Sequence, residues 1–572
     1  MYKISLMVAF CLLACFASAQ DPSKYKADLD HQFDKGSAIA SIPPDVRRIN
    51  DLVILGKVWG FVKYYHPAVC AGEYSWDYEL FRVLPKVMQC NNDKERNEIL
   101  YTWIKQLGEF KTGKIKQPDS ARVKLYPDIQ WINDVSVLGA PLSAQLNEIK
   151  NAKRKFTGYY LGIGRGANPQ FKNENEYTAM RYPDAGVRLL AIYRYWNIIQ
   201  YFFPYKYLIG EDWNNVLPEF IPKFVNAGNE LEYKLAALEL IARVHDTHAN
   251  FWSLDPALEQ KRGSNFAPLA ITFPENKVVV SGYLNAELGQ KTGLKKGDII
   301  TGINGKSTDS IIKENLPFTP ASNYPTQLRN MSFQLLRTAD TILNINYQRG
   351  NTIHTTSISC FPWEKVNPFK GHGDTCFKYL TPEIVYINPG YIKNDYLPKV
   401  MPDFLKTKAM IIDMRFYPSD DVYPVLCKYL LPERVPFVRT TYADLVNPGF
   451  FIFGRPTEVG SKNPDHYKGR IVILVNESTQ SAAEFTSMAF RVAPQATVIG
   501  STTAGADGNV SFFFLPGGVK TCISGIGIYY PDGRETQRVG IVPDITVQPT
   551  IQGIIDGRDE MLEKAIAIIN GK

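Results

Sequence analysis

The sequence predicts a multidomain α+β protein, and three observations support this prediction. The chain has 572 residues, of which 45% are apolar and 21% charged, so it exceeds one domain and can fill several buried cores. An amphipathic helical pattern occurs twice in the first half, short strands follow, and apolar strands then alternate with helical stretches after residue 382. We expect helical regions at 20–150 and 182–262, a β domain at 263–350 and an α/β core at 365–570.

The N-terminus has the pattern of a secretory signal peptide over residues 1–19. Lys3 precedes an apolar run, and Ala17-Ser18-Ala19 forms a small-residue site that predicts cleavage after Ala19. We therefore expect export to the periplasm or the extracellular space. An alternative is a lipid anchor on Cys15, because Leu12-Leu13-Ala14-Cys15 resembles a bacterial lipoprotein box. No other apolar run reaches the roughly 20 residues of a membrane span.

The charge pattern and the spacing of possible metal ligands limit the classes of partner that the sequence predicts. Lys and Arg number 64 against 57 Asp and Glu, a net charge of +7 without a basic run, which argues against nucleic acid. Six cysteines follow the signal, and the simplest disulfides join Cys70 to Cys90 and Cys360 to Cys376. Neither Cys-x-x-Cys nor His-Glu-x-x-His occurs, so the sequence predicts no metal and no cofactor.

The first half contains an internal repeat at an offset of 137 residues (196 − 59). Each copy begins with a predicted helix, 52–65 or 189–202, and the second copy ends with another at 230–244. We interpret the matched aromatic residues as helix core. The gap-free matches are Trp59, Tyr64, Pro67, Trp76, Pro85 and Lys86 with Trp196, Tyr201, Pro204, Trp213, Pro222 and Lys223.

The two copies differ at one candidate site residue. The second copy continues as His245-Asp246-Thr247-His248, whereas the offset places Lys111 opposite His248 in the first copy. A histidine retained for helix-end structure would be expected in both copies. The difference therefore indicates a site specific to the second copy.

The β segment resembles a PDZ domain over 263–350. Short strands at 268–273 and 277–283 precede the string Gly-Leu-x-x-Gly-Asp-x-Ile-x-x-Ile-Asn-Gly-Lys at 293–306, which combines glycine turns, a strand and a hairpin turn. The resemblance implies that an extended peptide adds as a strand to the sheet edge. The alternative is a spacer domain with a closed groove.

Ser481 is the candidate nucleophile. Strands are expected at 384–387, 409–414, 470–475 and 497–500, and the third of them runs into a tight loop from which Ser481 begins a helix. A helix N-terminus offers free backbone N–H groups and positive potential to an oxyanion. Ser481 is equally suited to be a simple N-cap.

Several strings resemble the C-terminal processing peptidase and tricorn-like serine peptidase family. Val475-Asn476-Glu477-x-Thr479-x-Ser481-Ala482-Ala483-Glu484 resembles its nucleophile motif, and 411–418, 498–505 and 540–545 resemble neighbouring strand ends. This resemblance covers roughly 182–570. It implies a PDZ-like domain and a ClpP/crotonase-like peptidase core in which Ser481 is the nucleophile.

The resemblance also indicates which branch of the family applies. Processing peptidases activate the serine with a Lys in Thr-x-Gly-Lys-Gly, but this chain has Ala506 at that position. The tricorn-like branch uses the His of an Asp-x-His segment after a helix, which matches His248 as general base. His245 is the alternative, at a position typical of packing or C-terminal capping.

The remaining site residues also come from the resemblance. A family Glu that orients the His aligns with Gln537; Glu535, two residues earlier on the same strand face, is preferred because a carboxylate stabilises imidazolium. Both can equally be solvent-facing residues of an edge hairpin. The oxyanion donors would be the N–H groups of Ala482 and Ser419, the latter where the family usually has Gly.

These observations predict an exported serine peptidase of the tricorn-like branch that cleaves extended protein or peptide substrates through an acyl-enzyme. One alternative is an inactive family member that binds peptides or an envelope partner. Another is a glycan-binding surface protein, which would require Trp59, Trp196 and their neighbours to face solvent.

Overall fold

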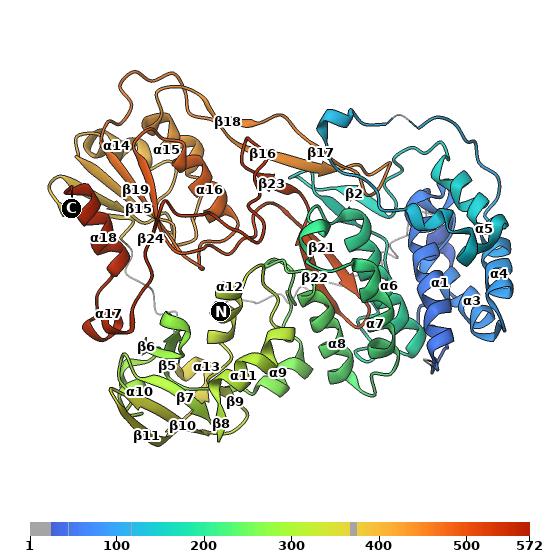
Figure 1. Cartoon of the computed structure of the whole chain (residues 1–572), viewed down its shortest axis with the longest axis horizontal. Helices are drawn as coiled ribbons and strands as arrows, with labels where there is room; N and C mark the ends of the chain where they lie inside the picture. The colour runs from blue at the N-terminus through green and yellow to red at the C-terminus, as the bar shows by residue number, and fades with distance from the viewer. Residues whose placement is uncertain (1–24, 44, 116, 367–374, 572) are drawn as a thin grey trace, which may run out of the picture.

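The computed structural model describes residues 25–43, 45–115, 117–366 and 375–571. The predicted signal peptide with Cys15 lies outside these residues, and so does 367–374, near the expected start of the core. Figure 1 shows a helical region at one end, an α/β core at the other and a smaller β domain beside the core. Within the described residues, no helix combines the length and apolar character needed to cross a bilayer.

The helical region consists of two similar sets of helices. The first has α1 (Val46–Tyr65), α2 (Pro67–Cys70), α3 (Trp76–Gln89), α4 (Asp93–Lys105) and α5 (Val135–Lys150). The second has α6 (Ala185–Phe202), α7 (Trp213–Val225), α8 (Glu230–Ala242) and α9 (Pro256–Arg262). The sets share one apolar core in which Trp59 and Trp196 are buried.

The same tryptophan contact occurs in both sets. The indole of Trp59 donates to the Trp76 carbonyl at 3.0 Å, and the indole of Trp76 donates to the Trp59 carbonyl at 2.8 Å. Trp196 and Trp213 exchange the same pair of bonds at 2.8 and 3.0 Å. Each pair satisfies its buried indole N–H groups, so burial of these rings leaves no polar group unpaired. Buried tryptophans at these positions argue against the glycan-binding alternative.

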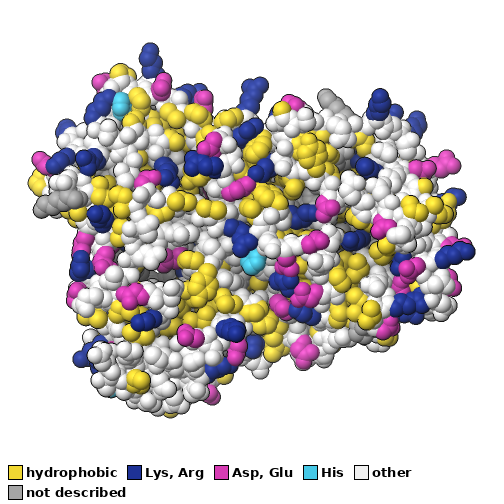
Figure 2. Space-filling model, viewed as in Figure 1, with side chains coloured by type: hydrophobic (Ala, Val, Ile, Leu, Met, Phe, Trp, Pro, Cys, Tyr) yellow, Lys and Arg dark blue, Asp and Glu magenta, His cyan; other side chains and the backbone are white. Residues whose placement is uncertain are grey.

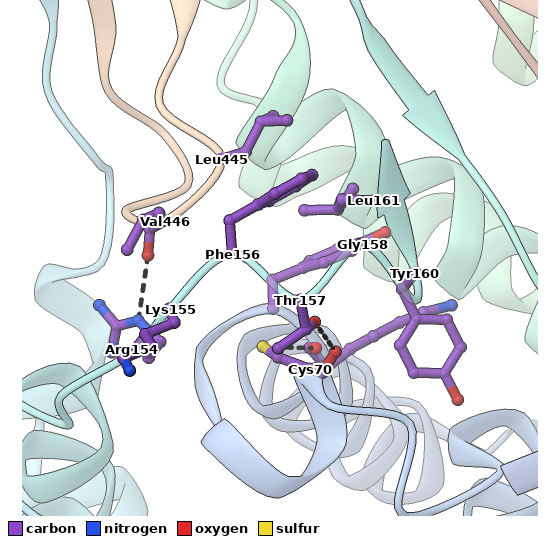
Figure 3. A pocket seen from close by; sticks show the side chains of 12 residues that line it. Cys70, Arg154, Lys155, Phe156, Thr157, Gly158, Tyr160, Leu161, Leu445 and Val446 are labelled. Atoms are coloured by element: carbon purple, nitrogen blue, oxygen red, sulfur yellow. Dashed lines mark hydrogen bonds between the residues drawn. The ribbon is translucent and has the colours of Figure 1, made fainter. Parts of the chain in front are cut away.

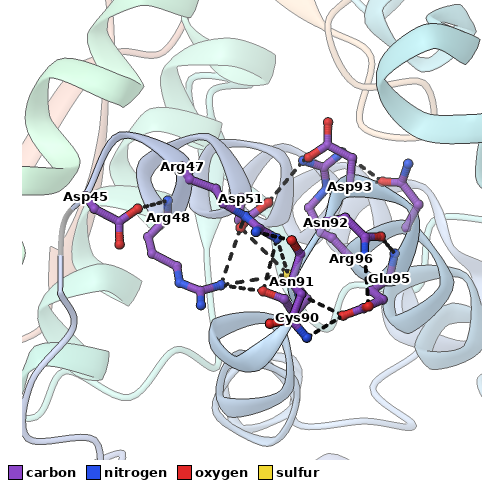
Figure 4. A network of polar contacts seen from close by, with 11 residues as sticks. Asp45, Arg47, Arg48, Asp51, Cys90, Asn91, Asn92, Asp93, Glu95 and Arg96 are labelled. Carbon is purple, nitrogen blue, oxygen red and sulfur yellow. Dashed lines mark hydrogen bonds and ion pairs between the residues drawn. The ribbon is translucent and has the colours of Figure 1, made fainter.

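The expected disulfides are absent, and this corrects the prediction from cysteine spacing. Cys70, Cys90, Cys360 and Cys376 are free thiols, as are Cys427 and Cys522. Cys90 lies in a polar network at the start of the first helical set, near Arg47 and Asp51 (Figure 4). Cys70 instead contacts the Lys63 carbonyl at 3.6 Å. Spacing along the chain does not report the side-chain environment that decides pairing.

The β domain is built on a sheet of the order β11-β10-β7-β6-β5, with β8 paired to β7. Helices α10, α11 and α12 accompany it, and its sheet continues to residue 359, beyond the expected end at 350. The elements are β5 (Leu269–Thr272), β6 (Val279–Tyr283), α10 (Ala286–Gln290), β7 (Ile299–Ile303), β8 (Lys306–Ser307), α11 (Thr308–Asn315), α12 (Tyr324–Ser332), β10 (Ile342–Arg349) and β11 (Thr352–Ser359). A small separate sheet and one short helix join it to its neighbours. They are β4 (Asn265–Phe266), β9 (Arg337–Thr338), β12 (Phe361–Pro362) and α13 (Trp363–Val366).

The core contains a mixed sheet of the order β13-β14-β15-β19-β20-β24, parallel except for β13. Helices cover both faces: Met410 and Ile412 pack towards the α14–α16 side, whereas Ile411 packs towards α18. The strands are β13 (Phe377–Thr381), β14 (Ile384–Ile387), β15 (Ala409–Asp413), β19 (Arg470–Val475), β20 (Ala496–Gly500) and β24 (Ile545–Thr546). The helices are α14 (Leu397–Phe404), α15 (Tyr423–Leu430), α16 (Ala482–Arg491), α17 (Ile551–Asp556) and α18 (Glu560–Ile569).

Segments of the second half reach back to the helical region. The hairpin of β21 (Val510–Leu515) and β22 (Val519–Ser524) lies beside α6, α7 and α8 in Figure 1, and its Phe513 and Leu515 belong to the helical core. A second sheet joins β1 (Val123–Leu125), β16 (Val435–Ala443), β17 (Phe451–Phe453), β18 (Thr457–Val459) and β23 (Gly527–Tyr529). The hairpin β2 (Leu161–Ile163) and β3 (Pro169–Phe171) lies against β21.

The loop after β16 also binds the first helical set. Arg154 donates to the Val446 carbonyl at 3.0 Å beside a small pocket that Cys70 and Leu445 line (Figure 3). The helical region and the core therefore form one continuous body.

On the outer surface, Figure 2 shows Lys and Arg side chains interspersed with Asp and Glu over the whole visible face.

Candidate active site around Ser481

Ser481 lies at a strained turn between β19 and α16. Its backbone has φ 56° and ψ −121°, a combination that residues other than glycine rarely adopt. The Ser481 N–H donates to the Ala506 carbonyl at 3.0 Å and to Glu484 Oε2 at 3.1 Å. A strand, a sharp strained turn and a helix expose a serine hydroxyl at the top of a sheet, and this geometry suits a nucleophile.

Glu484 holds the turn in place from inside helix α16. Its buried carboxylate accepts from the N–H groups of Gly505 at 2.8 Å and Ala506 at 3.1 Å, and from the Thr503 hydroxyl, in addition to Ser481 N–H. Burial raises the pKa of Glu484, while these donors oppose the rise. One carboxyl group thus joins the nucleophile turn to the loop 503–506.

A pocket of about 410 Å³ opens beside the nucleophile. Ser481 and Ala482 form part of its wall, and aromatic rings and two carboxyl groups form much of the rest. The lining includes Tyr417, Asp421, Tyr423, Tyr442, Phe485 and Asp507. Its size falls within the roughly 300–1,000 Å³ of pockets that hold a small ligand or side chain.

His248 lies in a buried network after helix α8. Its Nδ1 lies 3.0 Å from Ser524 Oγ and 3.7 Å from Asp246 Oδ1. Asp246 accepts from the Ser524 N–H at 2.7 Å, from the Ser524 hydroxyl at 3.2 Å and from the His248 N–H at 3.0 Å. Burial lowers the pKa of His248, and the Asp246 charge opposes this. The ring is therefore neutral near pH 7 and can accept a proton.

The other ring nitrogen is the one that a general base would use. Nε2 of His248 is buried and has no hydrogen-bond partner among the described residues. Ser481 and His248 share no hydrogen bond there either. The two residues are joined through the loop 503–506 instead, because Thr247 Oγ1 donates to the Ala504 carbonyl at 3.0 Å and the Ala506 carbonyl accepts from Ser481.

His245 has a different role in the structure. It follows α8 with φ 52°, and its N–H donates to the Ala242 carbonyl at 3.2 Å. The C-cap of α8 is Arg243, so His245 lies two residues beyond the cap, in a left-handed conformation within the turn that follows the helix. His245 is half-buried, and burial lowers its pKa.

Glu535 has partners other than His248. Its Oε1 accepts from Lys124 Nζ and from the Tyr207 hydroxyl, both at 2.7 Å. Gln537 is 1% exposed, and neither of its amide atoms has a partner among the described residues. The carboxylate that lies next to His248 in this structure is Asp246, whereas Glu535 binds Lys124 and Tyr207.

One of the two expected oxyanion donors is free. Ala482 is the first residue of α16, and its N–H has no acceptor in the described part of the chain. The Ser419 N–H instead donates to the Pro389 carbonyl at 3.0 Å. In this conformation Ala482 alone of the pair offers an open N–H beside Ser481.

Helix α12 of the β domain supports the loop that leads to Ser481. Arg329 donates to the Glu477 carbonyl at 2.7 Å and to Gln480 Oε1 at 2.9 Å, and Asn323 donates to the Thr503 carbonyl at 2.8 Å. The Ser322 hydroxyl contacts the Thr247 N–H at 2.9 Å. Contacts from the β domain therefore reach both the nucleophile loop and the His248 segment.

Sequence comparison assigns the core that carries Ser481. Residues 394–547 match the sequence model of peptidase family S41. This part of the chain belongs to peptidase family S41. The S41 segment contains Ser481, Ala482 and Ser419, whereas His248 lies outside it. No protein among the curated sequences matches the chain.

Solved structures resemble a larger part of the protein. Mature CPAF complexed with lactacystin has 13% sequence identity and a TM-score of 0.52, covering 68% of this chain and 99% of that chain. The photosystem II D1 C-terminal processing protease has 16% identity and a TM-score of 0.38, covering 66% and 98%. The tricorn protease has 14% identity and a TM-score of 0.35, covering 67% of this chain and 36% of that chain. The likeness to CPAF shows a shared fold.

Three polar residues of the site, Glu484, Ser524 and Asp507, were given no role from the sequence. Glu484 had a usable signal, since Ser-x-x-Glu at a helix start is the capping-box spacing. Ser524 and Asp507 had none. They come from a strand and a loop that approach Ser481 and His248 only after the chain has folded.

Proposed function

We propose that the protein is an exported serine peptidase that cleaves protein or peptide substrates through an acyl-enzyme. The observation that carries the proposal is the strained Ser481 turn, with the open N–H of Ala482 next to it. The core matches a peptidase family, so the reaction that we propose for this geometry is hydrolysis of a peptide bond.

The reaction would use His248 as the general base. Its unpartnered Nε2 takes the Ser481 hydroxyl proton as Oγ bonds to the substrate carbonyl carbon, and passes it to the leaving amine as the C–N bond breaks. Water then hydrolyses the ester, and the Ala482 N–H stabilises the oxyanion in both steps. Since Ser481 and His248 are not hydrogen-bonded here, a shift of the 503–506 loop would have to bring them together.

The other regions would serve this reaction. The β domain would be a PDZ-like domain that presents an extended chain along an outer strand, β5 or β11. The two helical sets would derive from one duplicated unit, as the matching Trp59–Trp76 and Trp196–Trp213 contacts suggest. A signal peptide at 1–19 would direct export, with a lipid anchor at Cys15 as the alternative.

The test is hydrolysis of unfolded protein by the purified mature chain. Wild type should release peptides from casein, whereas Ser481→Ala and His248→Gln should not, with unchanged circular dichroism. Ser478→Ala is the matched control, because Ser478 is an exposed serine in the same loop. Equal hydrolysis by wild type and Ser481→Ala would refute the proposal.

A second candidate function is binding without catalysis. It is favoured by the missing Ser481–His248 hydrogen bond and by Ala506 at the position of the family lysine. A folded wild type that binds unfolded chains but never cleaves them would support this function.

A further inference from the structure

The pocket beside Ser481 has an unusual charge balance. Its lining includes the carboxyl groups of Asp421 and Asp507 and no Lys, Arg or His. Neither carboxyl group forms an ion pair in the described part of the chain. A pocket that opens on a nucleophile and contains only acidic charged groups is complementary to a cation.

Asp507 is the unsatisfied group of this pocket. The residue is 2% exposed, and Oδ1 accepts the Gly508 N–H at 2.6 Å, while the buried Oδ2 has no partner. Burial, and next the nearby Glu484 charge, raise the pKa of Asp507 well above its ordinary value. A buried polar atom without a partner is costly, so a ligand that supplies a donor would be favoured at this point.

The rest of the wall suits a long cationic side chain. Tyr417, Tyr423, Tyr442 and Phe485 contribute aromatic rings, and Tyr423 packs against Phe485 at 5.4 Å between ring centroids. Aromatic faces attract guanidinium and ammonium groups while also covering the apolar stem. Asp421 is exposed, and it adds a second carboxyl group to the wall of the pocket.

We propose that this pocket selects lysine or arginine at the residue whose carbonyl Ser481 attacks, with Asp507 as the specificity-determining carboxylate. The inference rests on the proposed peptidase function. The position follows from the wall itself, because Ser481 and Ala482 line the pocket and the attacked carbonyl carbon is bonded directly to the Cα of that residue. On binding, the cation would pair with an ionised Asp507 and with the aromatic rings.

The test compares fluorogenic peptides that differ only at this residue: Arg, Lys, Gln, Leu and Phe. Wild type should cleave the Arg and Lys peptides with a kcat/KM about tenfold or more above the Gln peptide, the advantage expected of a charge-assisted hydrogen bond. Asp507→Asn should lose most of this ratio, chiefly by slower cleavage of basic peptides. Asp421→Asn should reduce it less, because that charge is solvent-screened.

Two results would overturn the inference, and they are distinguishable from each other. If wild type reacts at Ser481 with a fluorophosphonate but prefers Leu or Phe, the pocket assignment is wrong and the peptidase proposal stands. If wild type neither reacts with the fluorophosphonate nor cleaves any peptide, both proposals fail together. Should Asp507→Asn not fold, inhibition of wild type by peptide aldehydes ending in Arg or Leu decides, with the arginine aldehyde expected to bind about tenfold tighter.

Discussion

Ser524 Oγ lies 3.0 Å from Nδ1 of His248, and the Asp246 carboxylate accepts hydrogen bonds from the backbone N–H groups of both residues. This contact holds the imidazole by Nδ1, and Nε2 is left without a hydrogen-bond partner among the described residues. We predict that Ser524→Ala slows reaction of Ser481 with a fluorophosphonate by about 10- to 100-fold, the cost of one lost orienting hydrogen bond. The rate is measured by gel fluorescence over time. Thr521→Val is the control, because Thr521 is another buried hydroxyl on β22 whose Oγ1 has no partner. Equal rates in both variants would contradict the orienting role.

The pH dependence should reflect a neutral His248. Burial lowers its pKa, so the base form persists to lower pH than for a free imidazole. The rate of Ser481 labelling should therefore fall only below about pH 6.5, the ordinary value for histidine. Asp246 raises the pKa of His248, so Asp246→Asn should move this acid limb to still lower pH while reducing the plateau. An acid limb that moves to higher pH in Asp246→Asn would contradict this prediction.

Glu484 should matter for the shape of the nucleophile turn. Its two oxygens accept from three backbone N–H groups and from Thr503, and an amide offers one oxygen for them. Glu484→Gln should lower the free energy of unfolding by about 1–3 kcal/mol and also slow the labelling of Ser481. Urea unfolding measures the first effect, with the exposed Glu433→Gln as control. Unchanged stability together with unchanged labelling would refute this role.

His66 should make the first helical set sensitive to acid. Its buried ring packs edge-on against Phe110 at 5.0 Å, and burial lowers its pKa to about 4. The unfolded state takes up a proton near pH 6.5 and the folded state only near pH 4, so stability falls as pH decreases between these values, by about 3 kcal/mol in total.

The matching substitution is His66→Phe, because the offset of 137 places Phe203 opposite His66 (203 − 66). Urea unfolding at pH 7 and at about pH 4.5 should show a smaller difference for His66→Phe than for wild type. His31→Phe is the control at an exposed position. A difference as large as that of wild type would mean that another group controls the acid response.

Local patterns predicted most of the elements near the site. Strands expected at 384–387 and 470–475 have those bounds, and the helix expected from Ser481 begins one residue later, at Ala482. The period of apolar residues and the turn residues between them are local properties, so they are readable along the chain. The observed α1 begins at Val46, ahead of the expected residue 52, because Asp45 caps its N-terminus at the Arg48 N–H.

The contacts between distant segments could not be read in this way. Glu535 was preferred over Gln537 because a carboxylate stabilises imidazolium, yet Lys124 and Tyr207 bind it from parts of the chain more than 300 residues away. Ser524 meets His248 only because the β21–β22 hairpin folds back onto the helical region. Such pairings depend on packing, and no local period records them.

The proposed peptidase activity requires Ser481 to be the nucleophile, and the location of a covalent adduct tests this requirement. Mature protein is treated with a fluorophosphonate, digested and mapped by mass spectrometry, with Ser481→Ala and Ser478→Ala treated alongside. We expect one adduct, on Ser481, that is lost in Ser481→Ala and kept in Ser478→Ala. Peptide hydrolysis that continues in Ser481→Ala, or an adduct on another residue that abolishes activity, would contradict it.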